Sequence, residues 1–117
     1  MMTKYTKTLL LILVGLAGLH SNAFATHNRA GEITIRQIGD CNDLTIEATI
    51  VTYTKASSVA ADRDTLTICW DEDGIFCERV ARSNGNGNGV ILGNDVKFNT
   101  YIATHTYPAR GRYVISV

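Results

Sequence analysis

Five aspartates that could supply oxygen ligands to a cation stand in turn-forming stretches of the chain. They are Asp62, Asp64, Asp71, Asp73 and Asp95. Loop carboxylates can bind Ca²⁺, which takes roughly six to eight oxygen ligands. Residues 71–74, however, lack the full Asp-x-Asp-x-Asp-Gly spacing with a distal glutamate, and aspartate also serves turns by bonding its local backbone. Calcium binding and turn formation both stay open, and the sequence assigns no metal ligand.

The other residue types that could do chemistry form no recognisable set. His27 and His105 have no short metal-binding spacing to each other or to the cysteines. The serines beyond residue 25 are Ser57, Ser58, Ser83 and Ser116. None of them has the context of a nucleophile elbow or a triad, and the Asn-Gly run at 84–89 lacks the Lys-Ser/Thr ending of a phosphate loop. The sequence therefore predicts no catalytic residue and no cofactor, and we expect a protein that is not an enzyme.

The first 25 residues have the form of a secretory signal peptide. Lys4 and Lys7 give a positive n-region, residues 9–19 an apolar h-region, and Ala23-Phe24-Ala25 a small-residue cleavage site. The apolar run is too short for a spanning helix, which needs about 20 residues. We therefore expect an exported protein, extracellular or at the cell surface, without a stable membrane span; an uncleaved anchor is the alternative.

Residues 26–117 are enough for one small domain. Removing Lys4 and Lys7 from the eleven basic residues leaves nine, against eleven acidic residues. The two signs are interspersed, so nucleic acid is not an expected partner. Export also implies an oxidising compartment, in which the cysteines can pair.

Short segments with alternating apolar residues predict an all-β domain. The strand candidates are residues 30–38, 44–53, 65–70, 76–82, 96–107 and 113–117. They are rich in β-branched residues and show no helical period. Trp70 is the first choice for the core, because tryptophan is costly to leave exposed. Residues 83–89 have the low-complexity composition of a flexible loop.

A hairpin turn is predicted at residues 71–75. Its natural form has the loop Glu72-Asp73-Gly74, with Gly74 in the left-handed conformation. This register places Cys69 opposite Cys77, and a cross-strand disulfide needs Cβ atoms about 3.8 Å apart. We therefore expect a disulfide between Cys69 and Cys77, with Cys41 either free or paired with a segment beyond this chain.

The C-terminal run at residues 105–117 predicts a strand end, a tight corner and a second strand. Pro108 ends the first strand because it cannot donate to a ladder, and Gly111 permits a turn with positive φ. Gly111-x-Tyr113 has the form of the tyrosine corner of immunoglobulin-like sandwiches, in which the tyrosine hydroxyl bonds back to upstream backbone.

Taken together, His105-x-Tyr107 and Gly111-x-Tyr113-x-Ile115-x-Val117 resemble the closing motif of PKD domains, the immunoglobulin-like modules of many secreted and surface proteins. Residues 70–74, from Trp70 to Gly74, are loosely similar to the Trp-x-x-Gly-Asp-Gly turn of that family. A longer ordered pattern resembles the N-terminal module of large gliding-motility-associated bacterial surface proteins sorted by the type IX secretion system. Its segments are residues 26–34, 52–55, 61–66, 83–85, 93–95 and 104–107.

The resemblance covers essentially all of residues 26–117. It implies a PKD-type sandwich with a structural or adhesive role in a secreted or surface protein. The partners it implies are adjacent modules of a longer chain, or an extracellular protein or polysaccharide. The alternative from another class is a Ca²⁺-dependent carbohydrate- or peptide-binding domain that accompanies a secreted hydrolase.

Two features depart from the family pattern. This chain carries no C-terminal sorting domain or further modules, and Cys69 and Cys77 stand where ordinary strand residues are expected. In such a sandwich a last strand also follows the tyrosine-corner strand, whereas this sequence stops at Val117. We therefore expect an incomplete domain over residues 26–117, with an apolar edge at 113–117 that favours association.

Overall fold

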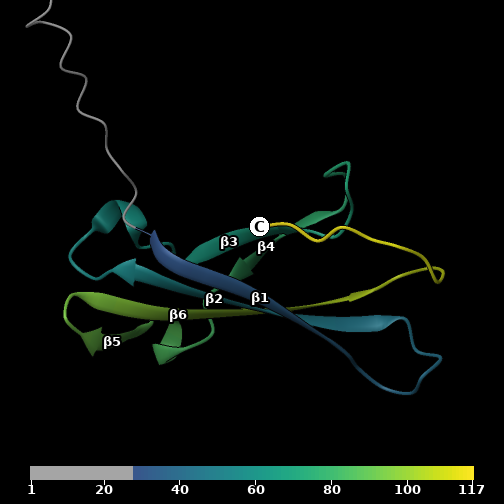
Figure 1. Ribbon diagram of the computed structural model, residues 1–117, viewed down its shortest axis with the longest axis horizontal. Helices are drawn as coiled ribbons and strands as arrows, with labels where there is room; N and C mark the ends of the chain where they lie inside the picture. Colours follow the sequence, from purple (N-terminus) through teal and green to yellow (C-terminus); the bar gives the residue numbers. More distant parts are fainter. Residues whose placement is uncertain (1–27) are drawn as a thin grey trace, which may run out of the picture.

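The computed structural model describes residues 28–117, so the signal peptide predicted for residues 1–25 and the candidate ligand His27 lie outside the described residues. The described chain is all-β, with two short 3₁₀ turns and no α-helix between residues 28 and 117 (Figure 1). The strands are β1 (Asn28–Gln37), β2 (Thr45–Lys55), β3 (Thr65–Cys69), β4 (Cys77–Ala81), β5 (Val90–Gly93) and β6 (Val96–Thr106). The 3₁₀ turns are η1 (Val59–Ala61) and η2 (Gly85–Gly87).

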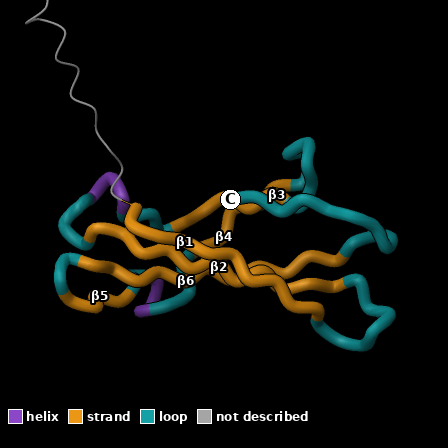
Figure 2. The backbone as a smooth tube through the Cα atoms, in the orientation of Figure 1, coloured by secondary structure: helices purple, strands orange, loops and turns teal. Residues whose placement is uncertain are grey.

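Two antiparallel sheets make up the fold (Figure 2). The larger has the strand order β1-β2-β6-β5, and the smaller is the β3–β4 hairpin. β2 and β6 pair without a register shift along their whole lengths, from Thr45 opposite Thr106 to Lys55 opposite Val96. These two long central strands form the platform on which the smaller sheet lies.

Residues from both sheets meet in one core. Ala48 and Ile50 of β2 and Tyr101 of β6 contact Ile68 and Trp70 from the smaller sheet. Alternation along β2 and β3 turns Ala48, Ile50 and Ile68 inward, as their alternating pattern predicts, whereas the burial of Tyr101 was not predicted. Trp70 is only 2 % exposed. The arrangement is compatible with a β-sandwich, in which two sheets pack face to face over apolar side chains.

The β3–β4 hairpin has the predicted register. Cys69 pairs with Cys77, and the amide of Trp70 donates to the carbonyl of Phe76 at 2.9 Å. Gly74 has φ +68°, the left-handed conformation that the three-residue loop requires. The predicted disulfide joins Cys69 to Cys77, and Cys41 is a free, exposed cysteine.

Breaking this disulfide by the double substitution Cys69→Ser and Cys77→Ser is expected to lower the free energy of unfolding by about 2 kcal/mol, because the bond closes only a short loop in the unfolded chain. Urea unfolding followed by circular dichroism measures the change. Cys41→Ser is the matched control and is expected to leave the midpoint unchanged, since Cys41 is exposed and unbonded. Equal midpoints for the double variant and the control would contradict the expectation.

The region between β4 and β6 differs from the prediction. Instead of a flexible loop at 83–89, the chain forms η2 and then a fifth strand, β5, which the sequence analysis did not identify. The side chain of Asn84 explains the order: its Nδ2 donates to the carbonyl of Phe98 at 2.9 Å, and its Oδ1 accepts from the amide of Thr100 at 3.0 Å. One side chain thus occupies the place of a strand partner beside β6.

The last segment also differs from the prediction. Residues 113–117 do not form a regular strand; they meet β3 through one bridge, in which Ser116 and Cys69 exchange hydrogen bonds of 2.8 and 3.0 Å. Ile115 packs against the core, whereas the ring of Tyr113 turns towards Tyr107. The stacking of Tyr113 on Tyr107 fixes the start of this segment. The residues that follow therefore pair with β3 at Ser116 only.

Candidate functional site

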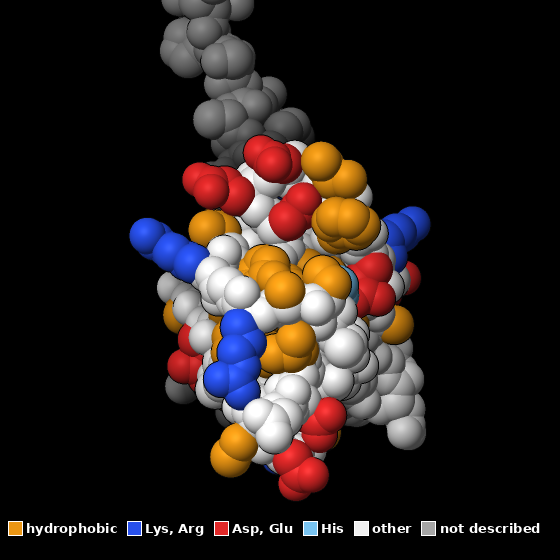
Figure 3. Space-filling view, turned by 90° about the vertical axis from the view of Figure 1, so that its right-hand side faces the viewer, with side chains coloured by type: hydrophobic (Ala, Val, Ile, Leu, Met, Phe, Trp, Pro, Cys, Tyr) orange, Lys and Arg blue, Asp and Glu red, His pale blue; other side chains and the backbone are white. Residues whose placement is uncertain are grey.

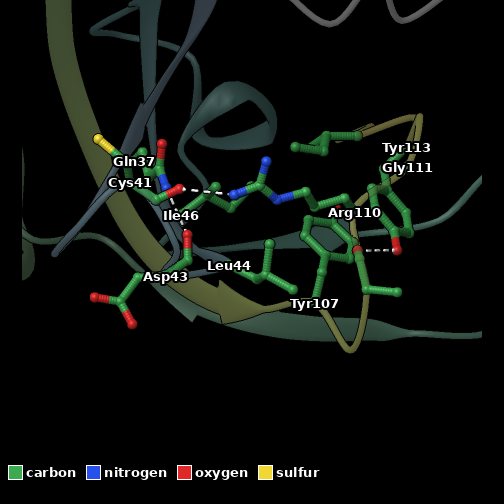
Figure 4. Close-up of a pocket in the computed structure, with 11 residues that line it drawn as sticks. Gln37, Cys41, Asp43, Leu44, Ile46, Tyr107, Arg110, Gly111 and Tyr113 are labelled. Atoms are coloured by element: carbon green, nitrogen blue, oxygen red, sulfur yellow. Dashed lines mark hydrogen bonds between the residues drawn. The ribbon is translucent and has the colours of Figure 1, made fainter.

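A cleft of about 430 Å³ opens between the β1–β2 turn and the C-terminal corner, residues 107–113 (Figure 4). The turn and the corner lie at the same end of the molecule as the β3–β4 hairpin loop (Figure 1). In the space-filling view of this end, hydrophobic side chains gather in the middle of the face, with acidic and basic side chains around them (Figure 3). The cleft therefore combines an apolar interior with a charged surround.

The floor of the cleft is apolar. Leu44, Ile46 and Ile115 are half-buried there and pack against the core. Ile46 is the inward-facing residue before Ala48 on β2, so the floor continues the inner face of the larger sheet. An apolar group of a ligand placed here would lose its contact with water on the side that faces the floor.

Two tyrosines form the wall. The rings of Tyr107 and Tyr113 stack with centroids 3.7 Å apart. The hydroxyl of Tyr113 donates to the carbonyl of Ala109 at 2.7 Å, four residues upstream, and the hydroxyl of Tyr107 donates to the carbonyl of Trp70 at 2.8 Å. Burial raises the pKa of the Tyr107 hydroxyl, with smaller contributions from Tyr113 and from the carboxylate of Asp71. Both rings are thus held at ring and hydroxyl, which makes the wall rigid.

A second hollow, of about 300 Å³, lies on the other side of these tyrosines. Trp70, Phe76, His105 and Pro108 contribute to its lining, together with the two tyrosines. The imidazole of His105 stacks on Trp70 at 5.0 Å and meets Tyr107 edge-on at 4.6 Å. A continuous row of aromatic rings therefore runs from the core to the surface of the corner.

The polar rim is organised by Arg110 and Gln37. Arg110 reaches across the cleft and donates through Nη2 to the carbonyl of Cys41 at 3.3 Å (Figure 4). The same nitrogen donates to Asn42 Oδ1 at 3.1 Å. Gln37 Nε2 donates to the carbonyl of Asp43. The Arg110 contacts join the β1–β2 turn to the corner, and the Gln37 contact closes the turn itself. The rim therefore keeps its shape and leaves the remaining guanidinium donors of Arg110 for a ligand.

The β1–β2 turn depends on Gly39. Gly39 has φ +87°, and a Cβ placed there would lie 2.1 Å from Asp43 Oδ2. That carboxylate oxygen accepts from the amide of Asp40 at 2.8 Å. One oxygen of the Asp43 carboxylate, which lines the cleft, is therefore already bonded to the backbone. The geometry of the cleft suits binding of a ligand with an apolar group and a hydrogen-bond acceptor.

The predicted motif residues lie in two groups. Tyr107, Gly111 and Tyr113 line the cleft, and Trp70 and His105 line the adjoining hollow. Gly74 and the disulfide belong to the β3–β4 hairpin and line neither. Arg110, Gln37 and the apolar floor were missed by sequence reasoning, because Arg110 and Cys41 are 69 positions apart and no local pattern marks their meeting.

The five candidate calcium ligands do not come together: each either makes its own hydrogen bonds or lies apart from the others. Asp71 accepts from the amides of Ile75 and Phe76, both at 3.1 Å, and Asp95 accepts from the amide and hydroxyl of Ser57 at 2.7 and 2.8 Å. These Ser57 bonds, the hydroxyl first, lower the pKa of Asp95. Over residues 28–117, no group of three or more His, Cys, Asp or Glu side chains converges on a point that could hold a metal ion.

These features define a class: a small, disulfide-bonded, all-β domain of two antiparallel sheets, with a cleft at one end. Comparisons with protein-family models, with curated proteins and with solved structures find no match for this chain. In the described part of the chain, no helix is long and apolar enough to cross a membrane.

Proposed function

We propose that the chain is a non-catalytic extracellular module of a secreted or cell-surface adhesin-like protein, of the immunoglobulin-like PKD type and with a gliding-motility-associated role. The observation that carries the proposal is the cleft, whose wall and rim are held in place by internal hydrogen bonds. A preorganised apolar cleft with one cationic donor group favours recognition of an extracellular polypeptide or polysaccharide segment.

Three further observations support this proposal. The disulfide between Cys69 and Cys77 is compatible with an oxidising compartment. The two-sheet architecture and the buried Trp70 are compatible with a sandwich module. The bond from Tyr113 to Ala109 has the form of a tyrosine corner. The alternative, a Ca²⁺-dependent binding domain that accompanies a secreted hydrolase, has less support because its candidate carboxylates do not converge.

A binding experiment on the exported protein tests the proposal. Intact mass first establishes whether residues 1–25 are absent, as the signal peptide predicts. The immobilised chain is then offered extracellular polypeptides and polysaccharides, and retention is measured. Arg110→Ala is expected to weaken retention about tenfold, because it removes the charged donor that spans the cleft, and arginine is enriched among the residues that dominate binding. Arg112→Ala is the matched control, since Arg112 is equally exposed and does not line the cleft.

Two results would count against the proposal: no retained ligand, or equal loss of retention in the two arginine variants. Repeating the measurement with a chelator separates the alternative. Retention that disappears when Ca²⁺ is removed would favour the Ca²⁺-dependent domain over the proposed module.

A further inference from the structure

β1 is an edge strand with one open side. The strand order places it at the end of the larger sheet, where it pairs with β2 without a register shift from Ala30 to Gln37. All ten of its residues are exposed. An unpaired strand edge carries a row of free amide and carbonyl groups that can template pairing with another strand.

The hydrogen-bond pattern shows which groups face outward. The amide of Ile38 donates to the carbonyl of Thr45 at 2.9 Å, so Ile38 faces β2. Residues of an antiparallel strand alternate in the neighbour they face. The even-numbered residues Arg36, Thr34 and Glu32 therefore also bond β2. The backbone groups directed to the open side are those of Gly31, Ile33, Ile35 and Gln37.

The open side lacks most of the usual protections of an edge strand, and its two charged residues, Glu32 and Arg36, lie on the outer face. Residues 31–37 contain no proline, no lysine and no bulge, and no charged side chain points inward. Ile33 and Ile35 instead point to the inner face, beside Ile50 and Ala48, which are buried. Ile33 and Ile35 themselves are 42 % and 43 % exposed. The inner face of the sheet is therefore apolar at β1 and uncovered there.

The sequence of this edge is complementary to itself. In antiparallel pairing about a two-fold axis at Thr34, Glu32 lies opposite Arg36 of the second copy, and Ile33 opposite its Ile35. The outward-facing backbone groups of the two strands then meet each other, and each such pair forms two hydrogen bonds. A slip by one residue would set outward-facing residues against residues that face β2, and is therefore excluded. A slip by two residues keeps the backbone bonds and loses the Glu32–Arg36 match.

The charges on the outer face favour the same register. Arg36 donates to Glu47 of β2 at 2.8 Å, and its side chain is still 71 % exposed. Among the described residues, Glu32 has no ion-pair partner. In the pairing about Thr34, Arg36 lies between its own Glu47 and Glu32 of the second copy. Opposite charges directly across a sheet are stabilising.

We propose that two copies of this chain associate through antiparallel pairing of their β1 strands, centred on Thr34. The two four-stranded sheets become one continuous sheet, and Ile33 and Ile35 of both copies form an apolar cluster on its inner face. The interface is isologous, so it closes after two copies. The partner is thus a second copy of the chain, and the surface is separate from the cleft.

Charge exchange tests the register. Glu32→Arg and Arg36→Glu each set like charges opposite one another at both ends of the interface, and each is expected to weaken the dimer about tenfold in sedimentation equilibrium. An equal mixture of the two variants places opposite charges at every position and is expected to restore dimers. The oxidised chain lacking its signal peptide is the reference.

Three further variants make the test decisive. Ile33→Pro removes an outward-facing amide that β2 does not use, so it is expected to give a folded monomer. Thr34→Cys, in a Cys41→Ser background, is expected to form a disulfide across the two-fold axis, whereas Ile33→Cys is not, because it faces Ile35. A reference chain that is monomeric at all concentrations would overturn the proposal. So would a dimer that persists in Ile33→Pro, or one lost only by substitutions at 113–117.

Discussion

Trp70→Ala is expected to reduce the free energy of unfolding by about 3–5 kcal/mol, a large part of the roughly 5–15 kcal/mol that stabilises a small domain. Trp70 is 2 % exposed and joins the two sheets. Its indole Nε1 donates to Glu78 at 2.8 Å, and its ring stacks on His105. Alanine would remove both of these contacts and leave a cavity.

Urea unfolding followed by circular dichroism measures the effect, because the variant lacks the chain's one tryptophan. Ile75→Ala is the matched control: Ile75 is also a large apolar residue of the hairpin, but it is 72 % exposed. Its substitution is expected to change stability by less than about 0.5 kcal/mol. Similar unfolding midpoints for the two variants would contradict the placing of Trp70 at the centre of the core.

Asp62→Asn is expected to destabilise the protein by roughly 2–3 kcal/mol, because it leaves a buried cation without its partner. The side chain of Arg82 is only 2 % exposed, and its Nη2 lies 2.6 Å from Asp62 Oδ1. Lys97 Nζ lies 2.9 Å from the same oxygen. The expected loss is below that of a fully buried pair because the side chain of Asp62 is 39 % exposed to solvent.

Two controls isolate the ion pair. Asp64→Asn changes a neighbouring aspartate whose side chain accepts only from the hydroxyl of Thr65 among the hydrogen bonds of the described residues. Its backbone carbonyl, which accepts from the amide of Arg82, is not altered by the substitution, and little change is expected. Adding Arg82→Met to Asp62→Asn removes the stranded charge and is expected to recover much of the lost stability. A double variant as unstable as Asp62→Asn would show that the buried guanidinium is not the cause.

The effect of Asp62→Asn should also depend on pH. The hydrogen bond from Lys97 is the largest cause that lowers the pKa of Asp62 in the folded protein, with a further contribution from Arg82, against the opposing effect of burial. A carboxyl group with a lowered folded-state pKa stabilises the protein above its unfolded pKa, about 3.9, and this contribution is lost as the pH falls through the folded value. The difference in unfolding midpoint between wild type and variant should therefore narrow below about pH 4. A constant difference would contradict the ion-pair explanation.

The structural features that depend on neighbours in the sequence could be predicted. The length of the 72–74 loop determines the register that brings Cys69 to Cys77, and alternation places Trp70 on the inner face. The spacing from Gly111 to Tyr113 predicted a hydrogen bond from the tyrosine hydroxyl to upstream backbone. In the structure the Tyr113 hydroxyl donates to the carbonyl of Ala109. Each of these depends on a few consecutive residues and on the geometry of a turn or strand.

Features that depend on distant contacts could not be predicted. Alternation marks Ile33 and Ile35 as strand residues, but whether another strand covers them is decided elsewhere in the chain. β5 is short and follows a glycine-rich run, so its residues show no clear strand pattern. It forms a strand because the side chain of Asn84 bonds β6 beside it. The cleft was missed for the same reason: the β1–β2 turn and the corner meet only through the folding of both sheets.

The bridge between Ser116 and Cys69 has a mechanical consequence. Tension along residues 113–117 passes through one pair of backbone hydrogen bonds to Cys69, which is covalently bound to Cys77. While the disulfide is intact, the hairpin loop between these cysteines cannot be pulled out, and β3 and β4 bear the load as a link of fixed length. Reduction would release the loop as additional contour length. Because Trp70 lies within this loop, its release would also disturb the core. In the proposed adhesive module under tension, the redox state of the surroundings would thus determine whether this end of the domain extends or holds its length.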